Sequence, residues 1–146
     1  MPVPNGIRMI DVADKPVTLR EARASARVRC APATAERIRS GTLDKGDAIA
    51  VARLAGVMAA KRTADIVPLC HPLPLESVEV SIGFDEPGAV AIAATVRATA
   101  RTGVEMEALV AVTAAALAIY DMAKSIDPSM SVEAVRLEEK RGGTRG

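Results

Sequence analysis

The chain has 146 residues, a length that suits one domain with its own hydrophobic core. Hydrophobic residues make up 49% of it and aromatic residues only 1%, so small aliphatic side chains must fill the interior and favour flat, close contacts. Lysine and arginine number 19 and aspartate and glutamate 18, and the net charge of +1 argues against binding nucleic acid or a membrane surface through bulk charge. Any anion-binding site must therefore be a local cluster of basic residues.

The two cysteines, Cys30 and Cys70, lack the C-x-x-C spacing of a metal site, and nothing indicates a disulfide framework. We therefore expect no metal, no cofactor and a reducing compartment. The chain shows no basic N-terminal segment followed by an apolar run, and no charge-free apolar stretch long enough to span a bilayer. These features predict a cytoplasmic protein that binds neither nucleic acid nor membrane.

The chain begins with a segment of low regularity. Residues 1–17 contain several prolines and no periodicity, which predicts a flexible arm at the start of a single domain spanning residues 1–146. Residues 18–23 are more regular. Residues 25–30 place apolar and basic side chains on alternate sides, which is typical of a half-buried strand.

Two helices are expected next. An early proline and a late glycine predict a short helix over residues 32–39 that stops at Gly41. Asp47 is a suitable N-cap for a second helix over residues 48–62, on which apolar and basic side chains fall on different faces. Gly56 within this helix would let another element approach closely.

A proline-rich loop follows, and it holds the only histidine of the chain. Residues 68–75 contain three prolines, which fix φ and keep the preceding residues extended, so Cys70 and His71 should be held rigidly. Histidine titrates near physiological pH, so His71 is a suitable proton donor, proton acceptor or phosphate contact. Taken alone, His71 could equally be an ordinary loop residue with a satisfied hydrogen bond.

The second half of the chain predicts a hairpin, a helix and a strand. Residues 78–84 and 90–97 alternate around a turn and should pair. Residues 104–126 form a helix that is apolar nearly all round, and residues 132–137 alternate again. This order predicts an α+β, ferredoxin-like (split βαβ) fold, an antiparallel sheet with helices on one face. A helix apolar all round in so small a domain also predicts oligomerisation.

Basic residues stand at both ends of the second helix. Lys45 precedes the helix beside a glycine, where free backbone N–H groups and an ammonium can converge on a phosphate, although an ordinary solvated helix start is the better interpretation of this motif alone. Lys61 and Arg62 end the same helix, where the helix dipole favours cations whether or not they bind anything.

Acidic residues stand at both ends of the long helix. Glu105 and Glu107 enter it, where acidic residues are favoured in any first turn. Asp121 and Lys124 are three residues apart and share a face, as an ordinary surface ion pair would. An apolar helix nevertheless has little reason to carry them unless they pair inside the protein or line a cavity, where their pKa values would move towards catalytic ranges.

Five motifs taken together are far more specific than any one of them. They are Lys45-Gly46-Asp47, the helix segment from Arg53 to Thr63, Pro68-Leu69-Cys70-His71-Pro72-Leu73, Thr102-Gly103-Val104-Glu105-Met106-Glu107-Ala108-Leu109 and Ile119-Tyr120-Asp121-Met122-Ala123-Lys124. In this order and spacing the chain resembles the cyclic pyranopterin monophosphate synthase family of molybdenum cofactor biosynthesis. The resemblance runs from Met9 to Gly143.

The resemblance implies a homohexamer, a trimer of dimers, with sites at the dimer interface built from both subunits. It implies a GTP-derived substrate, 3′,8-cyclo-7,8-dihydroguanosine 5′-triphosphate, which is rearranged to cyclic pyranopterin monophosphate with loss of pyrophosphate. By position, the family's catalytic residues match Asp121, Lys45 and Lys124. The substrate-binding positions match Leu69, Cys70, His71, Met106, Glu107, Glu105, Lys61 and Arg20.

The implied chemistry suits these residue types. Opening an imidazole ring and building a pyrazine ring need several proton transfers, which Lys, Asp, Glu and His side chains can carry. Closing a cyclic phosphate while pyrophosphate departs needs positive charge on the phosphate oxygens, which Lys61, Arg20 and His71 could supply.

Some positions depart from the family pattern, and two other functions stay open. Ala64 stands where some members carry a larger residue, and the tail 141–146 lacks the second lysine of a common ending, which puts a tail contact with phosphate in doubt.

One alternative function is a Schiff-base lysine enzyme. The other is a non-catalytic oligomeric module that binds purine nucleotides.

Overall fold

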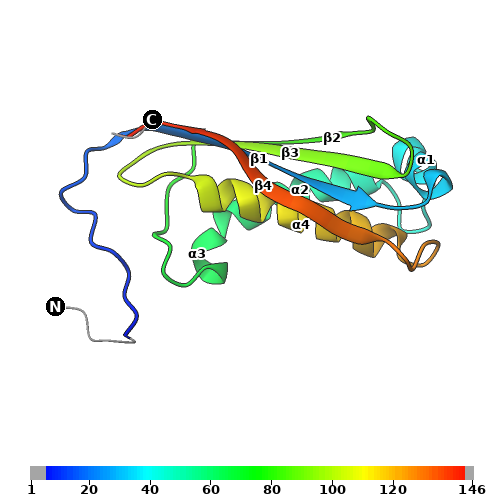
Figure 1. Ribbon diagram of the computed structural model, residues 1–146, viewed down its shortest axis with the longest axis horizontal. Helices are drawn as coiled ribbons and strands as arrows, with labels where there is room; N and C mark the ends of the chain where they lie inside the picture. The colour runs from blue at the N-terminus through cyan, green and yellow to red at the C-terminus, as the bar shows by residue number, and fades with distance from the viewer. Residues whose placement is uncertain (1–5, 144–146) are drawn as a thin grey trace.

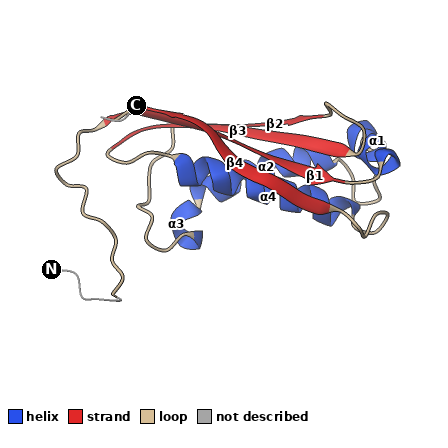
Figure 2. Ribbon diagram, viewed as in Figure 1, coloured by secondary structure: helices blue, strands red, loops and turns tan. Residues whose placement is uncertain are grey.

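A computed structural model describes residues 6–143 (Figure 1). The elements are β1 (Thr18–Arg29), α1 (Pro32–Ser40), α2 (Ala48–Lys61), α3 (Thr63–Ile66), β2 (Ser77–Gly83), β3 (Ala89–Ala100), α4 (Glu105–Ala123) and β4 (Ser131–Arg141). The four strands form one antiparallel sheet in the order β2-β3-β1-β4. Helices α2 and α4 pack against each other on one face of this sheet (Figure 2). This is the α+β, ferredoxin-like arrangement that the sequence predicts.

Several boundaries differ from the sequence prediction. Strand β1 begins at Thr18 instead of residue 25, because the alternation of buried and solvent-facing side chains already includes Arg20 and Ala22 on the core side. A buried arginine conceals this alternation in the sequence. Strand β4 continues to Arg141 because it pairs along β1 as an edge strand, and the short helix α3 was not predicted.

The caps of the first two helices are confirmed. Helix α1 ends at Gly41, whose φ of 71° is the left-handed conformation that glycine adopts at low cost. Asp47 caps α2 by accepting a hydrogen bond at Oδ1 from the backbone N–H of Ala50, at 3.1 Å.

The core consists of small aliphatic side chains between the sheet and the two long helices. Val28, Val96 and Ile119 are fully buried, and each such side chain stabilises the fold by roughly 1.5–3 kcal/mol. At Gly56 a Cβ atom would lie 2.8 Å from Val80 Cγ2 and 3.1 Å from the Ala111 carbonyl oxygen. The predicted close approach at Gly56 is therefore confirmed, and it lets α2 lie directly on α4 and β2.

Helix α4 is long and apolar enough to cross a membrane by length and composition alone. Half of its most apolar window is nevertheless buried inside the described domain, where α4 packs on β1, β3 and α2. The core helix of a globular domain meets the same criteria, so its composition reflects burial between sheet and helix.

The N-terminal segment follows no regular secondary structure between residues 6 and 17. In Figure 1 it leaves the start of β1 and runs away from the sheet. Residues 1–5, which also belong to the predicted flexible arm, lie outside the described residues, and so do tail residues 144–146.

Candidate functional site

Lys45 is presented by a tight turn that precedes α2. Leu43 is buried, and its carbonyl accepts a hydrogen bond from the Gly46 N–H at 3.0 Å. Gly46 adopts a φ of 110°, a conformation that other residues rarely adopt. Because the turn is anchored by Leu43 on one side and by the capped helix on the other, the start of the Lys45 side chain is fixed.

Asp121 lies between two lysines. Its Oδ1 is 3.0 Å from Lys124 Nζ and its Oδ2 is 3.1 Å from Lys45 Nζ, which also donates to the Asp121 carbonyl oxygen at 3.2 Å. Hydrogen bonds from Lys124 and Lys45, together with the positive charges of these two lysines, hold the pKa of Asp121 below its ordinary value, and Lys124 has the larger effect. We call these three residues the lysine–aspartate cluster.

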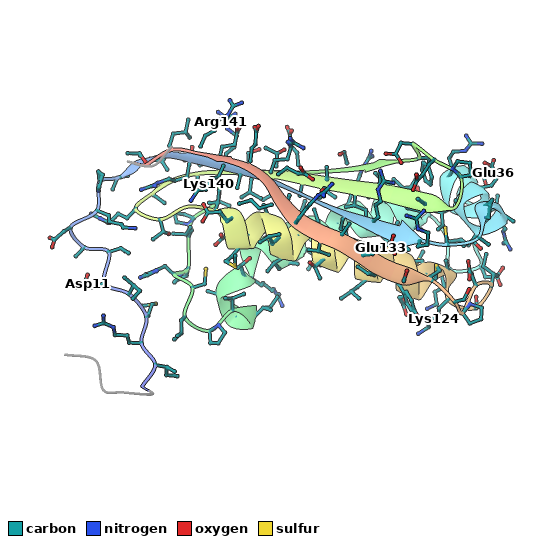
Figure 3. All side chains as sticks on the ribbon, in the orientation of Figure 1. Asp11, Glu36, Lys124, Glu133, Lys140 and Arg141 are labelled. Carbon is teal, nitrogen blue, oxygen red and sulfur yellow. The ribbon has the colours of Figure 1, made fainter. Side chains whose placement is uncertain are left out.

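The expectation that Asp121 and Lys124 pair inside the protein was wrong for the single chain. Their side chains are each 56% exposed, and that of Lys45 is 47% exposed. The cause is local: the last turns of α4 bury Ile119 and Met122 towards the sheet and leave the opposite face open to solvent. Figure 3 shows Lys124 at this end of the molecule.

Glu107 occupies the other end of α4 in a different environment. Its side chain is buried, its Oε2 lies 3.9 Å from Cys70 Sγ, and its Oε1 has no hydrogen-bond partner among the described residues. Burial, reinforced by the charge of Glu105, raises the pKa of Glu107. Burial and the neighbouring Glu107 likewise raise the pKa of the Cys70 thiol.

A small cavity adjoins Glu107. It has a volume of about 100 Å³, and Lys61 and Leu73 are among its lining residues. The structure therefore places Lys61, at the end of α2, beside the same cavity as Glu107. A cation next to an unpartnered buried carboxyl group can hold a polar or anionic ligand there.

The side chain of Arg20 is buried, and its hydrogen bonds go to backbone carbonyl groups. Its Nε donates to the Ala100 carbonyl at 3.2 Å, and its Nη2 donates to the carbonyls of Arg101 at 3.0 Å and Pro16 at 3.4 Å. One guanidinium group thus ties the base of the N-terminal arm to the loop that leads into α4. This loop sets the position of Glu105 and Glu107.

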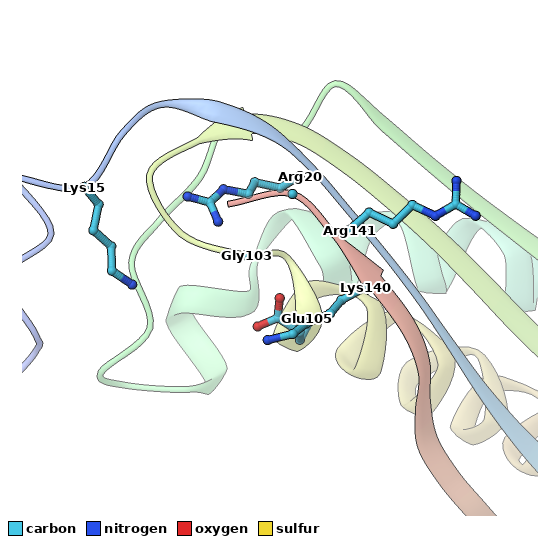
Figure 4. A pocket seen from close by; sticks show the side chains of 7 residues that line it. Lys15, Arg20, Gly103, Glu105, Lys140 and Arg141 are labelled. Carbon is cyan, nitrogen blue, oxygen red and sulfur yellow. The ribbon is translucent and has the colours of Figure 1, made fainter. Parts of the chain in front are cut away.

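A larger cavity lies beside Arg20 and has a volume of about 470 Å³. We call it the cationic cavity, and it is lined by Lys15, Arg20, Gly103, Glu105, Lys140, Arg141 and Gly142. Figure 4 shows Lys140 beside Glu105, whereas the Arg141 guanidinium points away from Lys15 and Arg20. With one carboxylate among four basic residues, the cavity suits an anionic ligand.

Sequence reasoning missed Lys15, Lys140 and Arg141 as lining residues. Lys140 and Arg141 reach this cavity because β4 pairs with β1, with Ala22 opposite Lys140 and Glu21 opposite Arg141. No sequence motif near these residues indicates such a pairing. The end of β4 thus brings Lys140 and Arg141 to the lining of this cavity, and tail residues 144–146 lie outside the described residues.

The remaining predicted residues lie on the proline-rich loop and at the start of α4. The loop begins with a turn in which Cys70 N–H donates to the Val67 carbonyl at 3.1 Å. His71 is partly exposed, and Leu69 and Met106 are more exposed. These side chains are available to a ligand or to another protein surface.

The predicted site residues form two groups in a single chain. Glu107 and Asp121 are 14 residues apart on α4, which at roughly 1.5 Å per residue separates their backbone positions by about 21 Å. The lysine–aspartate cluster is therefore at one end of the molecule, and all the predicted substrate-binding residues whose contacts are described above are at the other.

Exposed apolar side chains occupy the helices between these two groups. Val51, Leu54 and Met58 are 42%, 62% and 47% exposed on α2, and Leu117 is 58% exposed on α4. Their spacing of three or four residues puts the α2 side chains on one face. We call these four residues the apolar stripe, and within the described chain nothing covers them.

Known proteins are similar in sequence to this chain over nearly its whole length. A sequence model of the MoaC family matches residues 9–143. The proteins named cyclic pyranopterin monophosphate synthase from Herpetosiphon aurantiacus and Nostoc sp. are each 56% identical, over 94% and 95% of this chain and 85% and 83% of their own lengths. Cyclic pyranopterin monophosphate synthase 3 of Mycobacterium tuberculosis is 55% identical over 95% of this chain and 78% of its own. With this coverage and identity, the chain belongs to the MoaC family.

Proposed function

We propose that this protein is a cyclic pyranopterin monophosphate synthase, a lyase of molybdenum cofactor biosynthesis. It converts 3′,8-cyclo-7,8-dihydroguanosine 5′-triphosphate to cyclic pyranopterin monophosphate and pyrophosphate. The observation that carries the proposal is the contact of Asp121 with both Lys45 and Lys124, in a chain whose relatives bear this name. No metal or other cofactor takes part in the proposal.

The phosphate chemistry is assigned to the basic residues at the Glu105 end of α4. To close the cyclic phosphate, a substrate hydroxyl group gives up its proton to a basic group of the site and its oxygen bonds to the α-phosphorus, while the bond to the bridging oxygen breaks and pyrophosphate leaves with the electron pair. Negative charge builds up on the phosphate oxygens during this step. We assign phosphate binding to Arg20, which lines the cationic cavity, to Lys61, which lines the cavity beside Glu107, and to His71 on the proline-rich loop.

The proton transfers of ring opening and ring closure are assigned to the lysine–aspartate cluster. Asp121 is an ionised carboxylate at neutral pH that holds the two ammonium groups in place and can accept a proton, and the lowered pKa makes it a weaker base than a free carboxylate. Glu107, whose pKa is raised, is suited to hold a proton. Carboxyl groups whose pKa values move in opposite directions can take opposite roles in one reaction.

The two groups of residues would meet in a complex of two chains. A two-fold axis perpendicular to α2 and α4, placed at the apolar stripe, would set the Asp121 end of one chain against the Glu107 end of its partner. This packing would also cover the apolar stripe. We infer a dimer of this kind within a homohexamer, a trimer of dimers located in the cytoplasm, with each site completed by the partner subunit.

The direct test supplies the purified protein with 3′,8-cyclo-7,8-dihydroguanosine 5′-triphosphate. We expect pyrophosphate and the pterin product in equal amounts. Tight binding of the substrate without pyrophosphate release would instead indicate the non-catalytic nucleotide-binding module. Borohydride trapping of a lysine with the substrate would indicate the Schiff-base enzyme.

A further inference from the structure

Asp127 is a buried carboxylate that the proposed reaction does not use. It lies in the loop after α4 and is 5% exposed. Its Oδ2 accepts hydrogen bonds from the Ala31 N–H and the Thr34 hydroxyl, both at 2.9 Å. Its Oδ1 accepts hydrogen bonds from the N–H and the hydroxyl of Ser129, at 3.2 Å and 3.0 Å. These hydrogen bonds, the one from Ala31 most of all, hold the pKa of Asp127 below its ordinary value, so the group is ionised at neutral pH.

The Asp127 carboxylate caps helix α1 from a distant part of the sequence. Ala31, the N-cap residue of α1, has no side chain that can accept a hydrogen bond, and the first turn of the helix holds no acidic residue. A negative charge at a helix N-terminus is favourable, and Asp127 supplies it. Within α1, all of which the structure describes, burial is confined to Thr34, Ala35 and Ile38. Because this apolar contact is small, the orientation of α1 depends on the polar contact with Asp127.

The other end of α1 leads directly into the turn that presents Lys45. The Arg37 guanidinium donates to the Thr42 carbonyl and, at 3.4 Å, to the Thr42 hydroxyl, and the Thr42 N–H donates to the Arg37 carbonyl at 3.1 Å. Leu43, the next residue, is buried. On the other side of Lys45, Gly46 separates the turn from α2 and lacks the Cβ atom that limits backbone rotation. Helix α1 is therefore the support that directs the Lys45 backbone.

From these contacts we propose that Asp127 is a positioning residue for Lys45. By holding the start of α1 on the loop after α4, it keeps Lys45 Nζ at 3.1 Å from Asp121 Oδ2. Lys45 and Asp121 are 76 residues apart, whereas Lys124 follows Asp121 on α4 and needs no such support. The catalytic consequence rests on the proposed function, but the placement of Lys45 can be tested without it.

Three substitutions separate this role from simple stabilisation. Asp127→Asn replaces one acceptor oxygen by an NH2 group, which cannot accept a hydrogen bond from a backbone N–H. Thr34→Val removes one hydrogen bond on the α1 side of the carboxylate and keeps the branched shape of the side chain. Ser129→Ala removes one hydrogen bond to the other oxygen, within the loop after α4, and is the matched control.

The first experiment titrates Asp121 by NMR in the full-length protein, labelled with carbon-13 at the aspartate carboxyl groups. The Asp121 signal is assigned by its loss in Asp121→Asn. Lys124 and Lys45 both lower the pKa of Asp121, so displacement of Lys45 should raise it. We expect Asp127→Asn, and to a smaller extent Thr34→Val, to move the pKa of Asp121 towards its value in Lys45→Ala.

Two controls make this titration decisive. Ser129→Ala should leave the pKa of Asp121 as in the wild type, and adding Asp127→Asn to Lys45→Ala should change it no further. An unchanged pKa in Asp127→Asn, or a further rise in the Lys45→Ala background, would overturn the proposal. If Asp127→Asn does not fold, Thr34→Val is judged by the same two criteria.

The second experiment measures pyrophosphate release from 3′,8-cyclo-7,8-dihydroguanosine 5′-triphosphate. Displacing a reacting group lowers rate more than binding, so kcat of Asp127→Asn should fall by about 10-fold or more with KM nearly unchanged, while Ser129→Ala should match the wild type. A raised pKa of Asp121 combined with wild-type kcat would refute the positioning role. If the wild type releases no pyrophosphate, the proposed function fails, and the titration still decides whether Asp127 places Lys45.

Discussion

The two ends of helix α4 hold carboxyl groups in opposite environments. Asp121, at the C-terminal end, is half exposed and bonded to two lysines, which lower its pKa. Glu107, at the N-terminal end, is buried beside Cys70 with one oxygen unpartnered, and its pKa is raised. One rigid helix thus presents a charged carboxylate at one end and a readily protonated carboxyl at the other. The predictions below test whether these ends have separate roles.

The largest effect is expected at the exposed end. Asp121→Asn keeps the shape of the side chain but removes the charge that holds Lys45 and Lys124 and the ability to accept a proton. We expect turnover to fall by about 10²–10⁴-fold, the usual contribution of general acid–base catalysis. Pyrophosphate release at saturating substrate measures this loss, with circular dichroism and sedimentation as folding controls. Near wild-type turnover would reduce Asp121 to an ion-pair partner.

A second prediction contrasts a lysine from each end. Lys124→Ala, in the lysine–aspartate cluster, should mainly lower the turnover of bound substrate, and Lys61→Ala, beside the Glu107 cavity, should mainly weaken substrate binding. We expect an effect of about 10-fold or more on kcat for the first and on KM for the second, since each removes a charged contact. Single-turnover rates at saturating substrate separate the two effects. If both variants lose single-turnover rate equally at saturating substrate, the proposed division of roles between Lys124 and Lys61 is wrong.

The smallest effect is a pH dependence of stability at the buried end. An acid whose pKa is higher in the folded state holds its proton there more tightly, so stability falls as the pH rises from the unfolded value, near 4.5, through the folded value. Glu107→Gln cannot ionise and escapes this loss. The free energy of unfolding of Glu107→Gln relative to wild type should therefore increase between acidic and neutral pH. Urea titrations at a series of pH values measure it, and a constant difference would place Glu107 in a solvated environment.

The sequence predicts the fold well because its signals are local. Alternation in the hairpin, the Asp47 cap and the glycine at position 56 each depend on near neighbours, and the structure confirms all three. The start of β1 could not be found in this way. Arg20 faces the core there because the carbonyls of Ala100 and Arg101, distant in sequence, accept its hydrogen bonds.

Most residues of the candidate site could be predicted from the sequence, but their arrangement in space only partly. The motifs name residues at both ends of α4, and their spacing on the helix already implies two separate groups. The basic residues of β4 join Arg20 only through strand pairing, so no motif reveals them. The exposure of Asp121 depends on which helix face the sheet covers, and in the sequence the helix looks apolar on every side.

The central claim is that each site combines the Asp121 end of one chain with the Glu107 end of its partner, and mixed subunits test it most directly. Lys124→Ala and Glu107→Ala are each expected to retain at most about one tenth of wild-type activity alone. When the two are co-expressed with different affinity tags and allowed to assemble at random, half of the dimers contain both chains, and each mixed dimer has one intact site. Activity should therefore recover to about one quarter of wild type. If the mixture stays as inactive as its components while mixed oligomers are isolated through both tags, the site is contained in one chain and the account is contradicted.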